Sequence, residues 1–166
     1  MSAVTFEELR EESLPEVLAI YTHYVQNTTA TFHAHALSLA EMREVVFFDS
    51  PKYQTYAIRA ASGVICGYVL LTQHKKREAY DGTAEVTIYL HPDFTGQGIG
   101  GQAIAFIEKA ARERNFHVLV ATICGQNAAS IQLFERNGFS RCAHYREVGR
   151  KFGQLLDVVA YQKIIS

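Results

Sequence analysis

Apolar residues recur at helical spacing in two segments near the start of the chain. Ser13 and Pro15 are typical of a helix start. The apolar face of this first helix carries Leu14, Val17, Leu18, Tyr21 and Val25. Ser38 followed by Glu41 is a capping-box pattern, and it predicts a second helix that runs to about Asp49. The pattern therefore opens with two amphipathic helices.

The middle of the chain changes from helical to β-strand patterning. Two β-rich apolar runs, 53–60 and 64–72, are joined by Ala61-Ser62-Gly63, which is a hairpin signal. Residues 83–90 alternate well enough to predict a third strand, which His91-Pro92 ends. These three segments predict an antiparallel meander.

The second half of the chain alternates between helix and strand patterns. The segments expected here are a helix, a buried strand, a helix and two antiparallel strands, at 103–114, 118–123, 128–136, 139–148 and 155–164. Strand–helix–strand segments favour parallel pairing, whereas hairpins favour antiparallel pairing. The sequence therefore predicts an α/β fold with a mixed central sheet flanked by helices.

Composition narrows the class of protein. The chain has 166 residues, 48% of them hydrophobic and 20% charged, and no linker or repeat divides it, which predicts one globular domain over 1–166. A net charge of −1 argues against a partner such as nucleic acid or an anionic membrane surface. No apolar run approaches the ~18 residues of a membrane span, and the acidic start is unlike a signal peptide. We therefore expect a cytoplasmic protein.

Cysteine and histidine spacing gives little support to a metal site. The three cysteines, Cys66, Cys124 and Cys142, are far apart and form no CxxC pair, so we expect reduced thiols. His33 and His35 share one strand face if that segment is extended, but no third ligand is apparent from spacing. We expect no metal.

A glycine-rich loop at 95–101 links a strand to a helix and is the strongest local signal for a ligand. Its backbone N–H groups and the helix N-terminus suit a phosphate or pyrophosphate, while a connection without a ligand is the alternative. Gly96, Gly98 and Gly101 satisfy G-x-G-x-x-G, but the next strand ends at 123–127 without the acidic residue that a dinucleotide fold places about 20 residues on. We therefore disfavour a dinucleotide-binding domain.

The strand 85–90, His91-Pro92 and the loop Gly96-Gln97-Gly98-Ile99-Gly100 together resemble the acetyl-CoA site of the GNAT N-acetyltransferases. The phosphinothricin and methionine sulfoximine acetyltransferase branch of that family is similar at four further segments, AIYTHY, NTTATF, NAAS and REVGRKFG, at 19–24, 27–32, 127–130 and 146–153. The resemblance extends over nearly the whole chain. It implies the GNAT fold, in which two central strands splay apart.

The resemblance also implies the position of the acetyl-CoA site. In the family, the pantetheine arm lies along the strand like an added strand, loop amides hold the pyrophosphate, and the next helix start supplies a side-chain contact. The coenzyme-binding residues implied are Ile88, Tyr89, Leu90, Thr95, Gly96, Gln97, Gly98, Ile99, Gly100, Asn127 and Ser130.

Glu85 occupies the family's general-base position, and an amine must lose a proton before it can attack a thioester. Since no cysteine stands at a nucleophile position, direct transfer is favoured. The branch acetylates small carboxylate-bearing amines such as phosphinothricin, methionine sulfone and methionine sulfoximine. The acceptor-binding residues implied are Phe32, Lys75, Lys76, Arg77 and Tyr80. The branch also implies a homodimer, for which Phe47-Phe48 and Phe152 are candidate interface residues.

Three positions depart from the family pattern. Thr95 stands where the family usually has Arg, Phe134 where it has Tyr or His, and His74 where the branch often has Trp. Phe134 has no proton to give to the leaving thiolate, so that proton must come from solvent or another group. The alternative function is therefore a non-catalytic acyl-CoA sensor or interaction module on the same fold.

Overall fold

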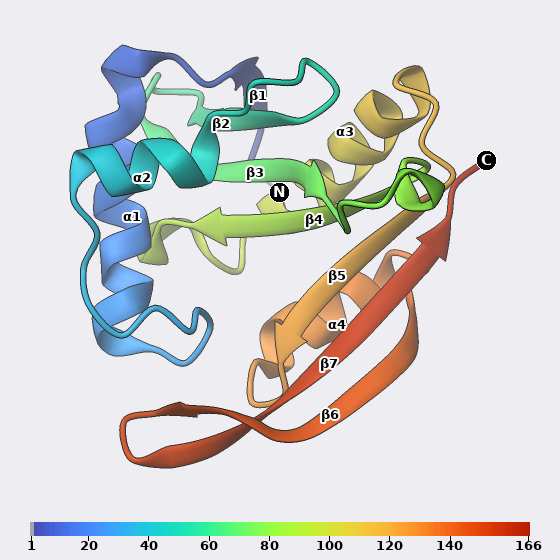
Figure 1. Cartoon of the computed structure of the whole chain (residues 1–166). Coiled ribbons are helices and arrows are strands. Elements are labelled where there is room, and N and C mark those ends of the chain that lie inside the picture. Colours follow the sequence, from blue (N-terminus) through green and yellow to red (C-terminus); the bar gives the residue numbers. More distant parts are fainter. Residues whose placement is uncertain (1) are drawn as a thin grey trace.

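The computed structural model describes residues 2–166 and places a seven-stranded mixed sheet between helices (Figure 1). The strands lie side by side in the order β1-β2-β3-β4-β5-β7-β6. Their bounds are β1 Val4–Glu8, β2 Gln54–Ala60, β3 Ile65–Gln73, β4 Thr83–Leu90, β5 Val118–Cys124, β6 Ser140–Lys151 and β7 Gln154–Ile164. The main helices are α1 Leu14–Asn27, α2 Leu39–Val46, α3 Ile99–Glu113 and α4 Ala128–Arg136. The predicted α/β fold with a mixed sheet is confirmed.

Two hydrophobic clusters hold the helices on opposite faces of this sheet. Ala84 and Val86 of β4 pack with Ile104 and Ile107 of α3 in the first cluster. Tyr68 and Leu70 of β3 join α1 and α2 in the second cluster. Alternate residues of one strand point to opposite faces, so β3 and β4 serve both cores. Helices therefore cover both faces of the sheet at β3 and β4.

Several sequence expectations were correct at residue level. The predicted bounds of β4 and α4 match the structure. Ser38 and Glu41 form both hydrogen bonds of the capping box. The helix they start ends at Val46 rather than Asp49, because Phe47 is extended and the Thr55 hydroxyl donates to the Val46 carbonyl oxygen at 2.7 Å. A contact from a distant strand therefore stops this helix.

Two expectations were wrong. Strand β1 was not predicted, since Val4–Glu8 is short and acidic, and its Phe6 ring stacks on Phe106 of α3, far away in the sequence. Helix α3 begins at Ile99, not near 103, because Gly98 adopts a left-handed conformation as its N-cap. The two glycines that follow lie inside the first turn. A Cβ on Gly100 would come within 2.8 Å of Leu133 on α4, so glycine permits close packing there.

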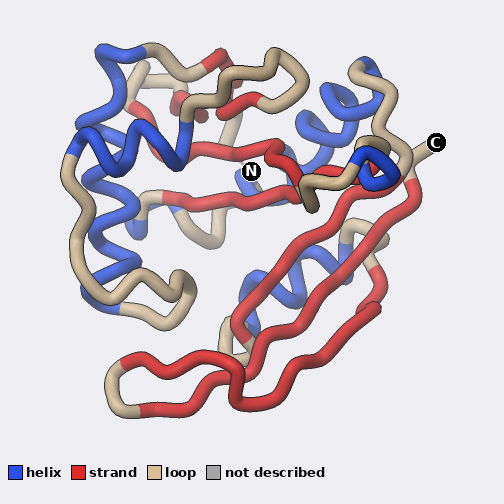
Figure 2. The backbone as a smooth tube through the Cα atoms, in the orientation of Figure 1, coloured by secondary structure: helices blue, strands red, loops and turns tan. Residues whose placement is uncertain are grey.

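The hairpin of β6 and β7 reaches beyond the rest of the sheet (Figure 1). Figure 2 shows the loop 28–38 between α1 and α2 as a tan segment. The hairpin contacts this loop, because Lys151 is buried and its Nζ donates to the Thr31 carbonyl oxygen at 2.8 Å. Burial lowers the pKa of the Lys151 ammonium. Within 2–166, no helix is both long and apolar enough to cross a membrane.

Gly67 provides a test of how closely β3 and β4 must approach. A Cβ at this position would lie 2.7 Å from both the Leu90 side chain and the Tyr89 carbonyl oxygen. Gly67→Ala is expected to lower the free energy of unfolding by about 1–3 kcal/mol, because the strands must separate. Chemical denaturation followed by circular dichroism measures this change.

The matched control is Gly101→Ala, where no atom lies within 4 Å of the added carbon and the backbone is helical. That change is expected to raise the free energy of unfolding by about 0.5–1 kcal/mol. Equal stability of the Gly67→Ala variant and the unsubstituted protein would contradict the close-approach argument.

Candidate active site

Strands β4 and β5 are hydrogen-bonded partners only at their beginnings. Their parallel register runs from Thr83 to Glu85 on β4 and from Val118 to Val120 on β5. Beyond these residues the two strands diverge, as Figure 1 shows. A V-shaped gap therefore opens directly after Glu85.

The backbone of β4 offers unpaired polar groups to this gap. The His91 N–H donates to the Cys66 carbonyl oxygen at 2.8 Å, so residues 91 and 66 form a hydrogen-bonded pair across β3 and β4. In an antiparallel ladder such pairs alternate, which directs the N–H and C=O groups of Ile88 and Leu90 to the β5 side. The Tyr24 hydroxyl donates to the Leu90 carbonyl oxygen. The N–H groups of Ile88 and Leu90 remain for a ligand.

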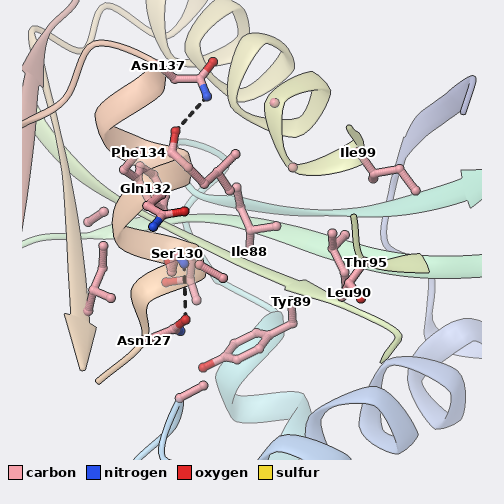
Figure 3. Close-up of a pocket in the computed structure, with 18 of the residues that line it drawn as sticks. Ile88, Tyr89, Leu90, Thr95, Ile99, Asn127, Ser130, Gln132, Phe134 and Asn137 are labelled. Carbon is pink, nitrogen blue, oxygen red and sulfur yellow. Dashed lines mark hydrogen bonds between the residues drawn. The ribbon is translucent and has the colours of Figure 1, made fainter. Parts of the chain in front are cut away.

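A cavity of about 690 Å³ occupies the gap (Figure 3). Its walls are β4 from Val86 onward, the glycine loop, the end of β5 and one side of α4. The volume lies in the usual range of small-molecule and cofactor sites. Sequence-predicted residues that line it are Ile88, Tyr89, Leu90, Thr95, Gly96, Gly98, Ile99, Gly100, Asn127 and Ser130.

The glycine loop leads into the free N-terminus of α3. Gly96 and Gly98 have φ values of +72° and +79°, a region that side chains other than glycine rarely adopt. No side chain caps this helix, so its first N–H groups are available to an anion. The Thr95 hydroxyl donates to the Pro92 carbonyl oxygen at 3.0 Å. The loop thus offers an uncharged anion site.

Gln97 is expected to contribute its backbone amide to this loop site, and its side chain forms contacts outside the cavity. The Ser2 hydroxyl donates to Gln97 Oε1 at 2.7 Å, and Gln97 Nε2 donates to the Asp93 carbonyl oxygen at 3.1 Å. Its side chain does not line the cavity. Gln97 therefore ties the loop to the N-terminal segment, a pairing that no local pattern predicts.

On the opposite wall, α4 presents a polar start and an apolar middle. Asn127 Oδ1 accepts a hydrogen bond from the Ser130 N–H at 3.2 Å and caps the helix (Figure 3). Phe134 is 3% exposed and meets Phe139 edge-to-face at 4.9 Å between ring centroids. Among the described residues that line the cavity, Arg136 has the single charged side chain. No local pattern in the sequence indicates that Arg136 lines this cavity.

Glu85 marks the point where the strands part, and two donors hold its carboxylate. His74 Nδ1 lies 2.9 Å from Glu85 Oε2, and the Thr122 hydroxyl donates to Glu85 Oε1 at 3.3 Å. The side chains of Glu85 and His74 are 28% and 21% exposed. Since Thr122 also lines the cavity, the carboxylate is linked to the gap through Oε1.

The predicted acceptor-binding residues divide into two groups. The Tyr80 ring meets the His74 ring edge-to-face at 5.7 Å between centroids. Lys75 Nζ and Arg77 Cζ lie 5.5 Å and 6.0 Å from the Tyr80 centroid, so this basic run is close to Glu85. Lys76 is exposed. Phe32 lies elsewhere, against Gly149 of the β6–β7 hairpin.

Two tyrosines, Tyr24 and Tyr89, are also part of the cavity wall. Burial raises the pKa values of Tyr24 and Tyr89, which keeps their hydroxyls neutral. The Tyr21 hydroxyl is shared between Thr31 and His33 Nδ1. His33, one of the two histidines considered above as metal ligands, therefore has Tyr21 as a hydrogen-bond partner. Within residues 2–166, no group of three or more His, Cys, Asp or Glu side chains is placed to hold a metal ion.

Comparison with known proteins gives consistent matches. The model of the acetyltransferase (GNAT) family matches residues 14–139. An L-methionine sulfoximine/L-methionine sulfone acetyltransferase of Pseudomonas paraeruginosa is 38% identical over 152 residues, 90% of this chain and 87% of that protein. A phosphinothricin N-acetyltransferase of Streptomyces coelicolor is 35% identical over 156 residues, 92% of this chain and 91% of that protein.

Among solved structures, a GNAT-superfamily phosphinothricin acetyltransferase from Sinorhizobium meliloti, in complex with acetyl-CoA, superimposes with a TM-score of 0.93. It is 26% identical, and the match covers all of this chain and 90% of that one.

Two substitutions of Asn127 test whether its side chain caps α4. Asn127→Ala is expected to lower the free energy of unfolding by about 1 kcal/mol, because the Ser130 N–H loses its acceptor. Asn127→Asp keeps that acceptor and is expected to leave stability nearly unchanged. Chemical denaturation without ligand measures both variants, and equal stability of the alanine variant and the unsubstituted protein would contradict the cap.

Proposed function

The chain belongs to the acetyltransferase (GNAT) family, and on this premise we propose that it transfers acetyl from acetyl-CoA to the amine of a small amino-acid-like acceptor. The relatives named for methionine sulfoximine, methionine sulfone and phosphinothricin support this acceptor class. The observation that carries the proposal is the unpaired edge of β4 beside a cavity whose wall includes Thr122, a hydrogen-bond donor to the Glu85 carboxylate. The activity is assigned to a single domain over 1–166.

Acetyl-CoA fits the chemistry of the cavity walls. Pantetheine contains two amides, and the N–H groups of Ile88 and Leu90 on the open edge of β4 suit the carbonyl oxygens of such amides. The pyrophosphate suits the free N–H groups at the start of α3 and the loop around Gly98. Asn127 and Ser130 face the same space from α4. The complex of the Sinorhizobium meliloti relative with acetyl-CoA supports this co-substrate.

Arg136 supplies a positive charge in place of the arginine that the family usually has at the position of Thr95. It is exposed and carries the single charge among the described lining residues. A coenzyme A molecule has two phosphate-bearing regions, so an arginine at the cavity wall strengthens binding through charge-assisted hydrogen bonds. We assign Arg136 to a coenzyme phosphate, while backbone amides of the glycine loop hold the pyrophosphate.

Glu85 is assigned as the general base for direct transfer. An acceptor ammonium with a pKa near that of lysine, about 10, is mostly protonated at neutral pH and must lose a proton before attack. Glu85 Oε1, on the cavity side, takes this proton directly or through one water. The neutral amine then attacks the thioester carbonyl carbon and forms a C–N bond. A backbone N–H on the open edge of β4 that does not bind pantetheine stabilises the oxyanion that forms.

Collapse of this tetrahedral intermediate breaks the carbon–sulfur bond and releases coenzyme A. Phe134 forms an apolar wall and has no proton to donate. A thiol with a pKa of about 8.5 is a fair leaving group, so solvent protonates the thiolate. The Phe134 substitution is therefore compatible with turnover.

The acceptor carboxylate is assigned to the basic run before Glu85. Lys75 and Arg77 flank Tyr80, which touches His74 beside the carboxylate of Glu85. Lys76 remains a candidate from the same run. We assign Tyr80 to the acceptor wall. Phe32, which packs against Gly149 of the β6–β7 hairpin, is a weaker candidate for that wall.

We also propose a cytoplasmic homodimer that uses the β6–β7 hairpin. This hairpin exposes large apolar side chains, namely Tyr145, Val148, Phe152 and Leu155. Exposed apolar patches of this kind are typical of interaction sites. Phe47 and Phe48 are half-buried against the α1–α2 core, so they are weaker interface candidates.

Turnover distinguishes the enzyme from a non-catalytic acyl-CoA sensor. With acetyl-CoA and methionine sulfone, methionine sulfoximine or phosphinothricin, the protein is expected to release free thiol. Glu85→Gln is expected to lower kcat about 10²–10⁴-fold, because general-base catalysis is lost, with little change in the KM for acetyl-CoA. A thiol-release assay measures both constants.

As a control, acetyl-CoA should raise Tm equally in the Glu85→Gln variant and the unsubstituted protein, whereas NAD and ATP should not raise it. A Tm increase with no thiol release across a broad amine panel would favour the sensor. Turnover that stays constant between pH 6 and 9 would contradict the role of Glu85.

The basic run gives a separate test of acceptor binding. Lys75→Gln and Arg77→Gln are each expected to raise the acceptor KM about tenfold, since a hydrogen bond to a charged group is lost. Lys109→Gln, an exposed position on α3, is the charge-matched control and should leave this KM unchanged. An unchanged acceptor KM in both Lys75→Gln and Arg77→Gln would remove these residues from the acceptor site.

A further inference from the structure

We infer that His74 is a positioning residue for the general base: it holds Glu85 Oε2 so that Oε1 faces the bound acceptor. This inference rests on the proposed function, and it adds a residue that departs from the pattern of the family branch. The contact that carries it is the 2.9 Å separation of His74 Nδ1 and Glu85 Oε2.

The chemistry of the two groups fixes the direction of this hydrogen bond. An ionised carboxylate only accepts, so Nδ1 must carry the hydrogen and donate it. Oε2 is thereby engaged by a strong, charge-assisted partner.

The other carboxylate oxygen is held more loosely and on the cavity side. Thr122 donates to Oε1 at 3.3 Å, longer than the His74 contact, and Thr122 itself lines the cavity. Oε1 therefore retains a lone pair for the acceptor proton, while the hydrogen bond from His74 restrains the carboxylate from turning away from the gap. This division of roles assigns Oε1 as the proton acceptor.

His74 is itself held in place at the end of β3. It directly follows Gln73, the last residue of that strand, and its ring meets Tyr80 edge-to-face. Its ring is not part of either hydrophobic cluster. Its described side-chain contacts are thus the carboxylate of Glu85 and the ring of Tyr80, which favours a role in positioning over a role in core packing.

Matched substitutions separate positioning from packing. His74→Phe keeps an aromatic ring for Tyr80 but removes the donor, and it is expected to lower kcat about tenfold, the effect of one hydrogen bond to a charged group. His74→Asn places an amide N–H near the former Nδ1 and is expected to stay within about threefold of the unsubstituted kcat. The KM for acetyl-CoA should be unchanged in both, because the coenzyme walls are not altered.

A double-mutant cycle shows whether His74 acts through Glu85. In the Glu85→Gln background, His74→Phe is expected to lower kcat by less than about twofold, since the carboxylate it positions is already lost. A purely structural effect would instead be multiplicative with that of Glu85→Gln. Tm and the acetyl-CoA-dependent rise in Tm check that each variant folds, and His74→Leu replaces the Phe variant if that protein is unstable.

Three results would overturn the inference. They are an unchanged kcat in His74→Phe, an Asn variant as slow as the Phe variant, or a full effect of His74→Phe in the Glu85→Gln background. Failure of the proposed function looks different, because the unsubstituted protein would then bind acetyl-CoA without releasing thiol from any acceptor, and the role of His74 would fall with it.

Discussion

The parting of β4 and β5 after Glu85 is the constraint on which the rest of the site depends. A strand inside a sheet normally satisfies its N–H and C=O groups on both edges, and groups left unpaired cost free energy when they are buried. Here the N–H groups of Ile88 and Leu90 on one edge face a cavity instead of a neighbouring strand. A ligand that supplies amides in an extended arrangement is the natural complement of this edge.

The elements around the gap place the free N–H groups of α3 at one end and the carboxylate of Glu85 at the other. Gly98 starts α3 at the outer end, and Gly100 lets that helix pack against Leu133 of α4. Asn127 caps α4 on the opposite wall. Glu85 stands at the closed end, in the last pair that joins β4 to β5. The run of β4 from Glu85 to Leu90 therefore separates the carboxylate from the glycine loop.

The net charge of −1 argues against extended polyanions as partners but not against a compact anion. The proposed anion site consists mainly of uncharged N–H groups, with Arg136 as a local cation. The acceptor side follows the same principle, since Lys75 and Arg77 gather around Tyr80 near Glu85. Local charge, not the overall balance, decides which ligands this fold can take.

Sequence reasoning succeeded where the signal is local and failed where it depends on tertiary contact. The bounds of β4 and α4, the capping box at Ser38 and the glycine loop were predicted, since alternation, caps and glycine conformations are short-range features. Strand β1 was missed, because its Phe6 ring stacks on Phe106 of a helix about 100 residues away. The hydrogen bond between the side chains of Gln97 and Ser2 likewise joins distant parts of the chain. The contact of His74 with Glu85 joins the residue after β3 to the third residue of β4, so no spacing pattern indicates it.

Residue-resolved amide hydrogen exchange with and without acetyl-CoA tests the central claim most directly. If the coenzyme adds itself to the open edge of β4, the amides of Ile88 and Leu90 should exchange more slowly when it binds. The amide of Tyr89 serves as an internal control, because it already pairs with β3 and should change little. Unchanged exchange at Ile88 and Leu90 with saturating acetyl-CoA would contradict the account.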